Sequence, residues 1–436
     1  MKSIYDLLFD WCEVDPDFEF IKYDKSYSIQ DIIYEVEAIS KSLKYIPSRH
    51  VGILIKSKFD FIIVYLSCIQ SNKIPVILKN NWGNEELNKV IKRNKINHII
   101  SEWGNKIKDV TVYFIEELVN SSRGCGIPTD TDYTNLYESI IFTSGSSGLP
   151  KGVRLNRRNF HASSIAWGKE IKFDFNDRYA ICLSLDHISG LAILYRSICH
   201  RFGLNLFDDY RDIHSSDASI VSLVPTILNM IINDSKYDHF LKSCKSIILG
   251  GEPAGLELLE LCLTLNLNVY LSYGMTETCS GVSGFWIQNH PDKLDSVGKA
   301  FNGVELSISD NFIKIKSDMN MLGYYLDENL NDFFITSDVG LIDKDFLYIN
   351  SNREHIAISG GEKININYIE KVLLRHESIE SAIIKIQKDG TWGQSIYADI
   401  TVNNNSISAL EIKKWCEDIV GRRKTPKKIN INKIVT

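Results

Sequence analysis

The stretch that decides the fold is Ile141-Phe142-Thr143-Ser144-Gly145-Ser146-Ser147-Gly148-Leu149-Pro150-Lys151-Gly152-Val153. An apolar, strand-like lead-in at residues 138–142 runs directly into a loop of glycines and hydroxyl side chains that ends in one lysine. Glycines let backbone N–H groups come close to an anion, hydroxyl groups add donors, and Lys151 adds a mobile positive charge. The pattern therefore predicts a phosphate-binding loop. Its candidate contacts are Thr143, Ser144, Gly145, Ser146, Ser147, Gly148 and Lys151.

Other kinds of loop share part of this composition. A Gly/Ser linker is also rich in small residues, but a linker rarely follows a buried strand directly and ends in Pro-Lys-Gly. A P-loop NTPase would need Gly-Lys-Ser or Gly-Lys-Thr at residues 150–152, where this chain reads Pro-Lys-Gly. No serine of the loop stands in a Gly-x-Ser-x-Gly frame, which argues against a nucleophile elbow.

Composition bounds the classes of function. The 436 residues are too many for one compact domain, and the 44% apolar share can bury a large core. A net charge of -6 offers no basic surface, so we expect no nucleic-acid partner. The nine cysteines form no Cys-x-x-Cys pair and indicate reduced thiols in a cytoplasmic protein. The longest apolar run, residues 61–69, is too short to span a bilayer and the amino terminus does not read as a signal peptide, so we expect no membrane association.

Strand and helix signals alternate along the chain. Residues 51–55 and 74–78 are continuous apolar runs of strand length, and residues 59–71 between them have helical periodicity. This βαβ unit implies a parallel sheet covered on both faces. Further apolar runs of strand length lie at residues 180–185, 219–224, 246–249 and 269–272. We therefore predict an α/β fold with a large amino-terminal domain of layered, parallel-rich sheets and helices, and active sites at the carboxyl ends of the strands.

Two of these later strands run into polar turns. The first turn carries His187 and Ser189, and a lone histidine at a strand end is more often structural than catalytic. The second is Gly250-Gly251-Glu252-Pro253, whose glycines permit either close approach of a flat ligand or simply a tight strand-to-helix turn.

A third strand leads into Ser272-Tyr273-Gly274-Met275-Thr276-Glu277. An aromatic ring, a hydroxyl and a carboxylate within five residues can stack a purine, bond a phosphate and hold Mg²⁺, which prefers one or two carboxylates together with phosphate oxygens. An ordinary turn with an exposed glutamate would read similarly.

These motifs, in this order, resemble the adenylate-forming (AMP-binding) family, which includes acyl- and aryl-CoA ligases, peptide-synthetase adenylation domains and luciferases. The resemblance implies that Tyr273 stacks the adenine, Thr276 binds the α-phosphate and Glu277 binds Mg²⁺. It implies that His187 lines the acyl pocket and that its ring changes position between two half-reactions. The other positions implied to contact nucleotide or acid are Ser189, Gly250, Gly251, Glu252, Pro253, Ser272, Gly274 and Met275.

The carboxyl-terminal part matches the family with two departures. Thr336-Ser337-Asp338-Val339-Gly340 resembles its Thr-Gly-Asp-x-Gly motif, which implies that Asp338 accepts the ribose hydroxyls. Asn352 stands where the family has a ribose-contacting arginine, so Arg353 is the candidate substitute, with a hinge near Glu354. The family's terminal lysine loop has no counterpart after Lys428, which suggests a truncated carboxyl terminus. The resemblance implies a domain at residues 1–351 and a small, mobile α+β domain at 352–436.

The resemblance implies an AMP-forming acid–thiol ligase that uses ATP, Mg²⁺ and CoA, with Lys151, His187, Thr276 and Glu277 as its catalytic residues. Four local matches resemble the o-succinylbenzoate-CoA ligases of menaquinone biosynthesis: residues 187–191, 248–251, 272–280 and 359–362. Two alternatives stay open. One is a ligase that loads the phosphopantetheine of a carrier protein, and the other is a nucleotide-binding pseudoenzyme without the terminal lysine. A small carboxylic acid is the expected partner, and a homodimer is left open.

Overall fold

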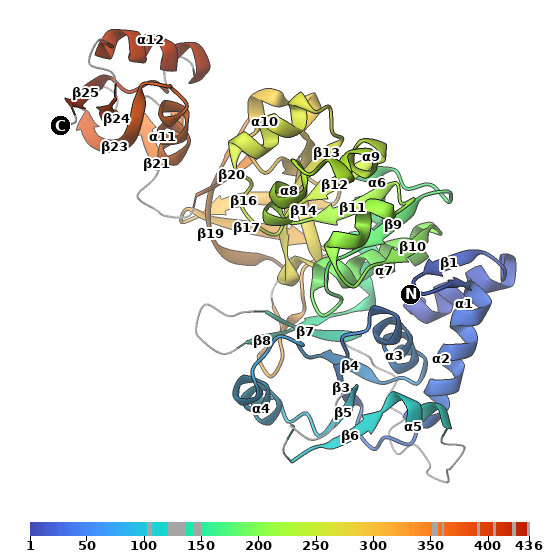
Figure 1. The fold of residues 1–436 in the computed structure, drawn as a ribbon. Coiled ribbons are helices and arrows are strands. Elements are labelled where there is room, and N and C mark those ends of the chain that lie inside the picture. Colours follow the sequence, from blue (N-terminus) through green and yellow to red (C-terminus); the bar gives the residue numbers. More distant parts are fainter. Residues whose placement is uncertain are drawn as a thin grey trace. The chain divides into compact units, whose positions relative to one another are not determined.

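The computed structural model describes residues 1–102, 107, 109–120, 137–143, 150–330, 332–350, 356–359, 362–389, 393–403, 407–420 and 424–433. The chain divides into two compact units, one of residues 1–305 and 315–334 and the other of residues 306–314 and 335–436 (Figure 1). The loop positions Ser144, Gly145, Ser146, Ser147 and Gly148 lie outside the described residues, as do Arg353 and the hinge position Glu354. The predicted domain boundary at 351/352 therefore stays a prediction.

The first unit contains a seven-stranded sheet in which the predicted βαβ unit is confirmed. Its strands run in the spatial order β18 (Gly323–Tyr324), β8 (Lys151–Leu155), β7 (Ser139–Thr143), β4 (Ile74–Ile77), β3 (His50–Leu54), β5 (His98–Ser101) and β6 (Thr111–Phe114). The strands from β7 to β6 are parallel, and β8 and β18 add an antiparallel edge. The buried central strands are continuous apolar runs because both faces of the sheet are covered.

A second sheet of the first unit carries the later motifs. The strands of this sheet that lie in the first unit have the order β15 (Lys299–Ala300), β14 (Ser280–Trp286), β13 (Val269–Met275), β12 (Ser246–Leu249), β11 (Ile220–Leu223), β9 (Arg178–Ile181), β10 (Gly203–Leu206), β1 (Glu19–Lys22) and β2 (Ser26–Ser28). The strands from β13 to β1 are mutually parallel. The polar turns after β12 and β13 consequently open at the same edge of this sheet.

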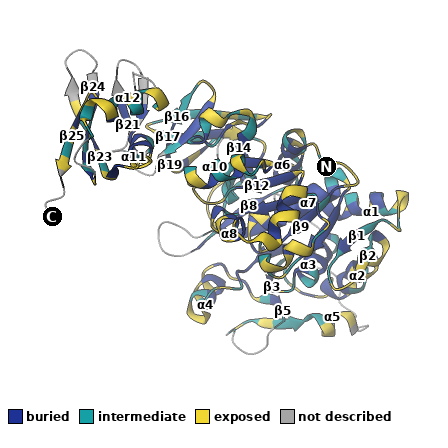
Figure 2. Cartoon of the chain, turned by 45° about the horizontal axis from the view of Figure 1, so that its top comes forward, coloured by how far each residue is buried: buried dark blue, intermediate teal, exposed yellow. Residues whose placement is uncertain are grey.

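Helices cover both sheets. They are α1 (Ile4–Val14), α2 (Ile29–Leu43), α3 (Lys58–Gln70), α4 (Asn84–Arg93), α5 (Ile115–Asn120), α6 (Arg157–Ile171), α7 (Ile188–His200), α8 (Pro225–Ile231), α9 (Asp238–Ser243) and α10 (Leu256–Thr264), with short 3₁₀ turns η1 (Tyr210–Ser215), η2 (Ser235–Tyr237), η3 (Thr276–Thr278), η4 (Ile287–Asn289) and η5 (Pro291–Lys293). Capping boxes at Ser3 and Ser28 start α1 and α2. Helix α7 is buried over nearly its whole surface, as Figure 2 shows, which explains why its sequence is apolar without a polar stripe.

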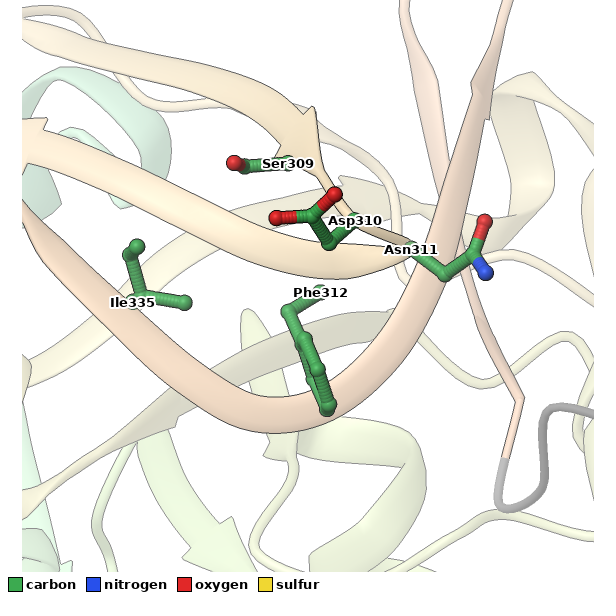
Figure 3. A pocket seen from close by; sticks show the side chains of 5 residues that line it. All are labelled: Ser309, Asp310, Asn311, Phe312 and Ile335. Carbon is green, nitrogen blue, oxygen red and sulfur yellow. The ribbon is translucent and has the colours of Figure 1, made fainter.

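Two hairpins lie near the start of the second unit. Strands β16 (Val304–Ser309) and β17 (Phe312–Ser317) are joined by Asp310 and Asn311, whose φ angles of 51° and 69° are typical of a two-residue type I′ turn. This turn lines a shallow hollow together with Ser309, Phe312 and Ile335 (Figure 3). Strands β19 (Phe334–Asp343) and β20 (Phe346–Asn350) form the other hairpin.

The rest of the second unit is a small α+β module. It consists of β21 (Ile356–Ser359), β22 (Glu362–Asn365), α11 (Ile366–Leu374), β23 (Ile379–Asp389), β24 (Gly393–Val402), α12 (Ala409–Val420) and β25 (Lys428–Lys433). Both helices pack on the sheet around a separate apolar core that includes Ile369, Ile400 and Ile412. The predicted fold class is thereby confirmed, including the α+β character of the carboxyl-terminal part. Within the described ranges, we find no helix with the length and apolarity needed to cross a bilayer.

Candidate active site

The two ends of the predicted phosphate loop are fixed by strand pairing. Strands β7 and β8 are antiparallel, and the last residue of β7, Thr143, pairs with the first residue of β8, Lys151. Both residues are partly buried. The loop therefore closes a hairpin at the carboxyl end of a parallel strand, which is the edge where ligands bind in α/β sheets.

Lys151 is linked to Glu277 through an aromatic residue that the sequence reasoning missed. The Lys151 ammonium lies 4.9 Å from the ring centroid of Tyr324, within the range of a cation–π contact. The Tyr324 hydroxyl donates a 3.0 Å hydrogen bond to Oε1 of Glu277. Burial, followed by the Glu277 charge, raises the pKa of Tyr324 well above its usual value, so the hydroxyl keeps its proton and remains a donor.

Tyr324 reaches this place because β18 pairs with β8. The pairing sets Tyr324 opposite Val153, and the Tyr325 N–H donates to the carbonyl of Gly152. Gly323 has a φ of 141°, and a Cβ there would lie 2.5 Å from a backbone oxygen of Glu328, so only glycine fits. A glycine followed by two tyrosines in a loose region was the signal available in the sequence.

Thr276 and Glu277 lie in the 3₁₀ turn η3, directly after β13. Backbone bonds fix this turn on two sides: the Cys279 N–H donates to the Thr276 carbonyl at 3.0 Å, and the Met321 N–H donates to the Glu277 carbonyl at 2.7 Å. Gly274 approaches β14 so closely that a Cβ would lie 2.0 Å from the Ser280 carbonyl oxygen. Local hydrogen bonding thus holds the hydroxyl and the carboxylate in place while both side chains remain partly accessible.

The Glu277 side chain suits the Mg²⁺ that the family implies. Its carboxylate lies beside the Tyr324 hydroxyl rather than in an ion pair within the described residues. One carboxylate together with phosphate oxygens is a donor set that Mg²⁺ favours. Glu277 would hold the ion, and the ion would neutralise charge on the nucleotide phosphates.

His187 forms the N-cap of α7 and contacts a buried lysine. Its Nδ1 and Nε2 lie 3.1 and 3.3 Å from the Lys79 ammonium. Burial, and then the Lys79 charge, lower the pKa of His187, while Asp186 acts in the opposite direction. The lowered pKa favours the neutral imidazole, which can accept a proton or a hydrogen bond. Ser189, one residue into α7, is exposed.

The turn after β12 meets β13 at Ser272. A Cβ on Gly250 would lie 2.8 Å from the Ser272 carbonyl oxygen, and Gly251 has a φ of 83°. Both observations explain why glycines occupy these positions. Gly251, Glu252 and Pro253 are exposed, and the Glu252 carboxylate accepts a 2.6 Å hydrogen bond from the Thr226 hydroxyl.

The remaining predicted site residues lie on strands β13 and β19. Tyr273 and Met275 are partly buried on β13. Asp338 lies on β19 in the second unit, where its backbone N–H donates a 3.0 Å hydrogen bond to the Thr336 hydroxyl oxygen. The roles of these residues toward ATP stay predictions.

The comparisons with known proteins agree with this architecture. The family model described as "AMP-binding enzyme" matches residues 8–325. The chain therefore belongs to the AMP-binding enzyme family, and the expected class, an AMP-forming acid–thiol ligase of the acyl-CoA synthetase family, is confirmed.

Several named proteins and solved structures are similar to this chain over most of its length. The chain is 28% identical to the 2-succinylbenzoate–CoA ligase of Bacillus licheniformis, over 95% of this chain and 93% of that protein. Among solved structures, it is similar to the o-succinylbenzoate CoA synthetase from Bacillus subtilis in complex with the acyl-adenylate intermediate (24% identity, TM-score 0.74, covering 98% of this chain and 94% of that chain). It is also similar to apo MatB from Rhodopseudomonas palustris (17% identity, TM-score 0.79, covering 98% and 94%). With this coverage, the truncated carboxyl terminus expected from the sequence is not evident.

Proposed function

We propose that this acid–thiol ligase acts on an aromatic keto acid of the o-succinylbenzoate type, with CoA as the thiol acceptor. The contacts that link Lys151 to Tyr324 and Tyr324 to Glu277 support the use of ATP in this proposal. It gathers one cation, one hydroxyl donor and one carboxylate beside the hairpin that holds the predicted phosphate loop. The o-succinylbenzoate type of acid is supported by the relatives' names at 27–28% identity.

The chemistry follows from what a carboxylate lacks. Its own leaving group would be oxide, so an oxygen of the acid attacks the α-phosphorus of ATP, the bond to the β-phosphate oxygen breaks, and pyrophosphate leaves. Lys151 offsets the negative charge of the phosphates, and the Thr276 hydroxyl orients the α-phosphate. Mg²⁺ held by Glu277 supplies further charge neutralisation when bound.

In the second step, the thiol of CoA loses its proton to solvent water, the thiolate sulfur attacks the carbonyl carbon of the adenylate, and AMP leaves with the electrons of the C–O bond. His187 lines the acyl side of the site in this proposal. Its neutral imidazole suits that position because it adds no second cation beside Lys79.

The experiment is pyrophosphate release by the full chain with ATP, Mg²⁺ and a panel of acids headed by o-succinylbenzoate, with CoA, with a phosphopantetheine carrier protein, or with neither. We expect release that depends on one acid and a CoA thioester as product. Transfer only to the carrier protein would point to the carrier-loading alternative. Bound ATP without release for any acid would point to the pseudoenzyme.

A matched pair of variants tests the site. Lys151→Met should lower pyrophosphate release by about 10²- to 10³-fold, as expected for removal of one preorganised charge donor. Lys169→Met is the control, because Lys169 is an exposed lysine on α6 that contacts Asn302. Equal rates in both variants would contradict the role of Lys151.

A further inference from the structure

Lys79 is a buried lysine at the carboxyl edge of the first sheet. It follows β4 by two residues and is only 8% exposed. Within the described part of the chain, no carboxylate oxygen lies within 4 Å of its ammonium, and its hydrogen-bond partner there is the His187 ring. Burial lowers the pKa of Lys79, with Asp186 and Glu86 opposing that effect. A buried cation is costly unless a negative group compensates it.

The contact with His187 compensates Lys79 poorly. A neutral imidazole has one acceptor nitrogen, and the ammonium lies nearly equidistant from both ring nitrogens, at 3.1 and 3.3 Å, so the contact is not directed along that single lone pair. The nearby Asp186 carboxylate is already engaged, since it accepts from the Asn80 N–H at 3.0 Å and from the Ser184 hydroxyl at 2.7 Å. Two of the three ammonium protons of Lys79 are therefore available to an anion.

In the first sheet, strand β7 separates Lys79, which follows β4, from Lys151, which begins β8. Strand β7 lies between β8 and β4, and Ile141 of β7 pairs with Ile77 of β4. Two residues further along, Thr143 and Lys79 stand at the same level, with Lys151 paired to Thr143 from the other side. Two lysines thus lie on either side of Thr143, where the predicted phosphate loop begins. Lys151 is linked to Glu277 through Tyr324, and Lys79 contacts His187.

The His187 ring is more exposed to solvent than the Lys79 ammonium that it contacts. The His187 side chain is 46% exposed, so the imidazole is the outer of the two groups. For an anion to reach the ammonium, this ring has to rotate about its side-chain bonds. The N-terminus of α7, a 13-residue helix that begins after His187, adds a partial positive charge at the same place.

We propose that Lys79 and His187 form a subsite for a second carboxylate of the acid substrate, one that is not activated. Lys79 is then a specificity-determining residue that selects dicarboxylic acids over the corresponding monoacids. This inference rests on the proposed function, because it assigns the acyl side of the same site.

The test compares two acids that differ only in the second carboxylate: o-succinylbenzoate and 4-oxo-4-phenylbutanoate. Lys79→Met should raise KM for the diacid by about 10- to 100-fold, the loss expected for one hydrogen bond between charged groups, and leave KM for the monoacid and for ATP within about twofold. Lys79→Arg should recover part of the loss. Lys73→Met is the matched control, because Lys73 precedes the same strand and donates to the Ile46 carbonyl at the opposite edge.

Three results would overturn the subsite: an equal loss for both acids, a rise in KM for ATP, or a wild-type protein that does not distinguish the acids. Calorimetric binding of the two acids to the full chain, in the presence of AMP, separates this inference from the proposed function. If no acid gives pyrophosphate release, the proposed function fails. Lys79-dependent binding of the diacid would still support the subsite, and equal binding of both acids would refute it.

Discussion

The hydroxyl of Tyr324 gives the sharpest test of the candidate site. Tyr324→Phe removes the 3.0 Å hydrogen bond to Glu277 and keeps the ring beneath the Lys151 ammonium. A hydrogen bond to a charged group contributes roughly 1.5–3 kcal/mol. At about 1.4 kcal/mol per tenfold change, kcat/KM for ATP should fall roughly 10- to 150-fold. KM for the acid should stay unchanged, because the lost bond holds the carboxylate on the nucleotide side.

The assay is steady-state pyrophosphate release at varied ATP and saturating acid, with Tm measured for each variant. Tyr325→Phe is the control, because Tyr325 neighbours Tyr324 in sequence but packs near His50. Tyr324→Ala should lose a further factor, since the cation–π contact with Lys151 contributes about 0.5–2 kcal/mol. A Tyr324→Phe protein with wild-type kcat/KM for ATP and an unchanged Tm would refute the role of this bond.

Two further predictions concern stability. The Glu138 carboxylate is buried with the Arg157 guanidinium 3.6 Å from its Oε1, and burial outweighs the opposing Arg157 charge and raises the pKa of Glu138 from 4.5 to about 7. The Glu138 contribution to the free energy of unfolding should therefore be fully present below pH 4.5 and be lost as pH rises through 7. The loss amounts to roughly 3 kcal/mol, at about 1.4 kcal/mol per pKa unit. Urea unfolding at pH 5 and 8 should show a smaller drop in Glu138→Gln, and an identical drop would contradict this account. Gly274→Ala places a Cβ 2.0 Å from the Ser280 carbonyl oxygen, so it should cost about 1–3 kcal/mol and weaken ATP binding. Gly255→Ala, where a Cβ meets nothing within 4 Å, should have the wild-type free energy of unfolding. A Gly274→Ala protein of wild-type stability would contradict this prediction, because it would show that β13 and β14 can move apart to admit the Cβ.

The parts of the fold that repeat over short distances could be predicted from the sequence. The runs expected at 51–55, 59–71 and 74–78 correspond to β3, α3 and β4 within one residue at every boundary. Strands buried on both faces are continuous apolar runs, so composition alone reveals them. The antiparallel strands β8 and β18 carry no such signal, because β8 begins at a lysine and the edge strand β18 has only two residues.

Pairings between distant segments of the site could not be predicted. Tyr324 stands in a loose region, and nothing local shows that it pairs with β8. Lys79 reads as a surface lysine after a strand, and only the folded structure shows that it is buried and in contact with His187, the N-cap residue of α7, 108 positions along the chain. Residues within a contiguous motif, such as Thr276 and Glu277, were accessible to sequence reasoning, whereas those contributed by tertiary packing were not.

The two-residue strand β18 also affects the order in which the protein is made. Arg154 on β8 donates to the Gly323 carbonyl, a contact between residues 169 positions apart. At about 5–20 residues per second, the ribosome needs roughly 10–30 s to deliver Gly323 after Arg154 has been synthesised. During that interval the outer edge of β8 has unpaired backbone groups, which other nascent chains can pair with. A holdase chaperone that binds exposed strands should therefore associate with the nascent chain while β8 is outside the ribosome and dissociate once β18 has docked.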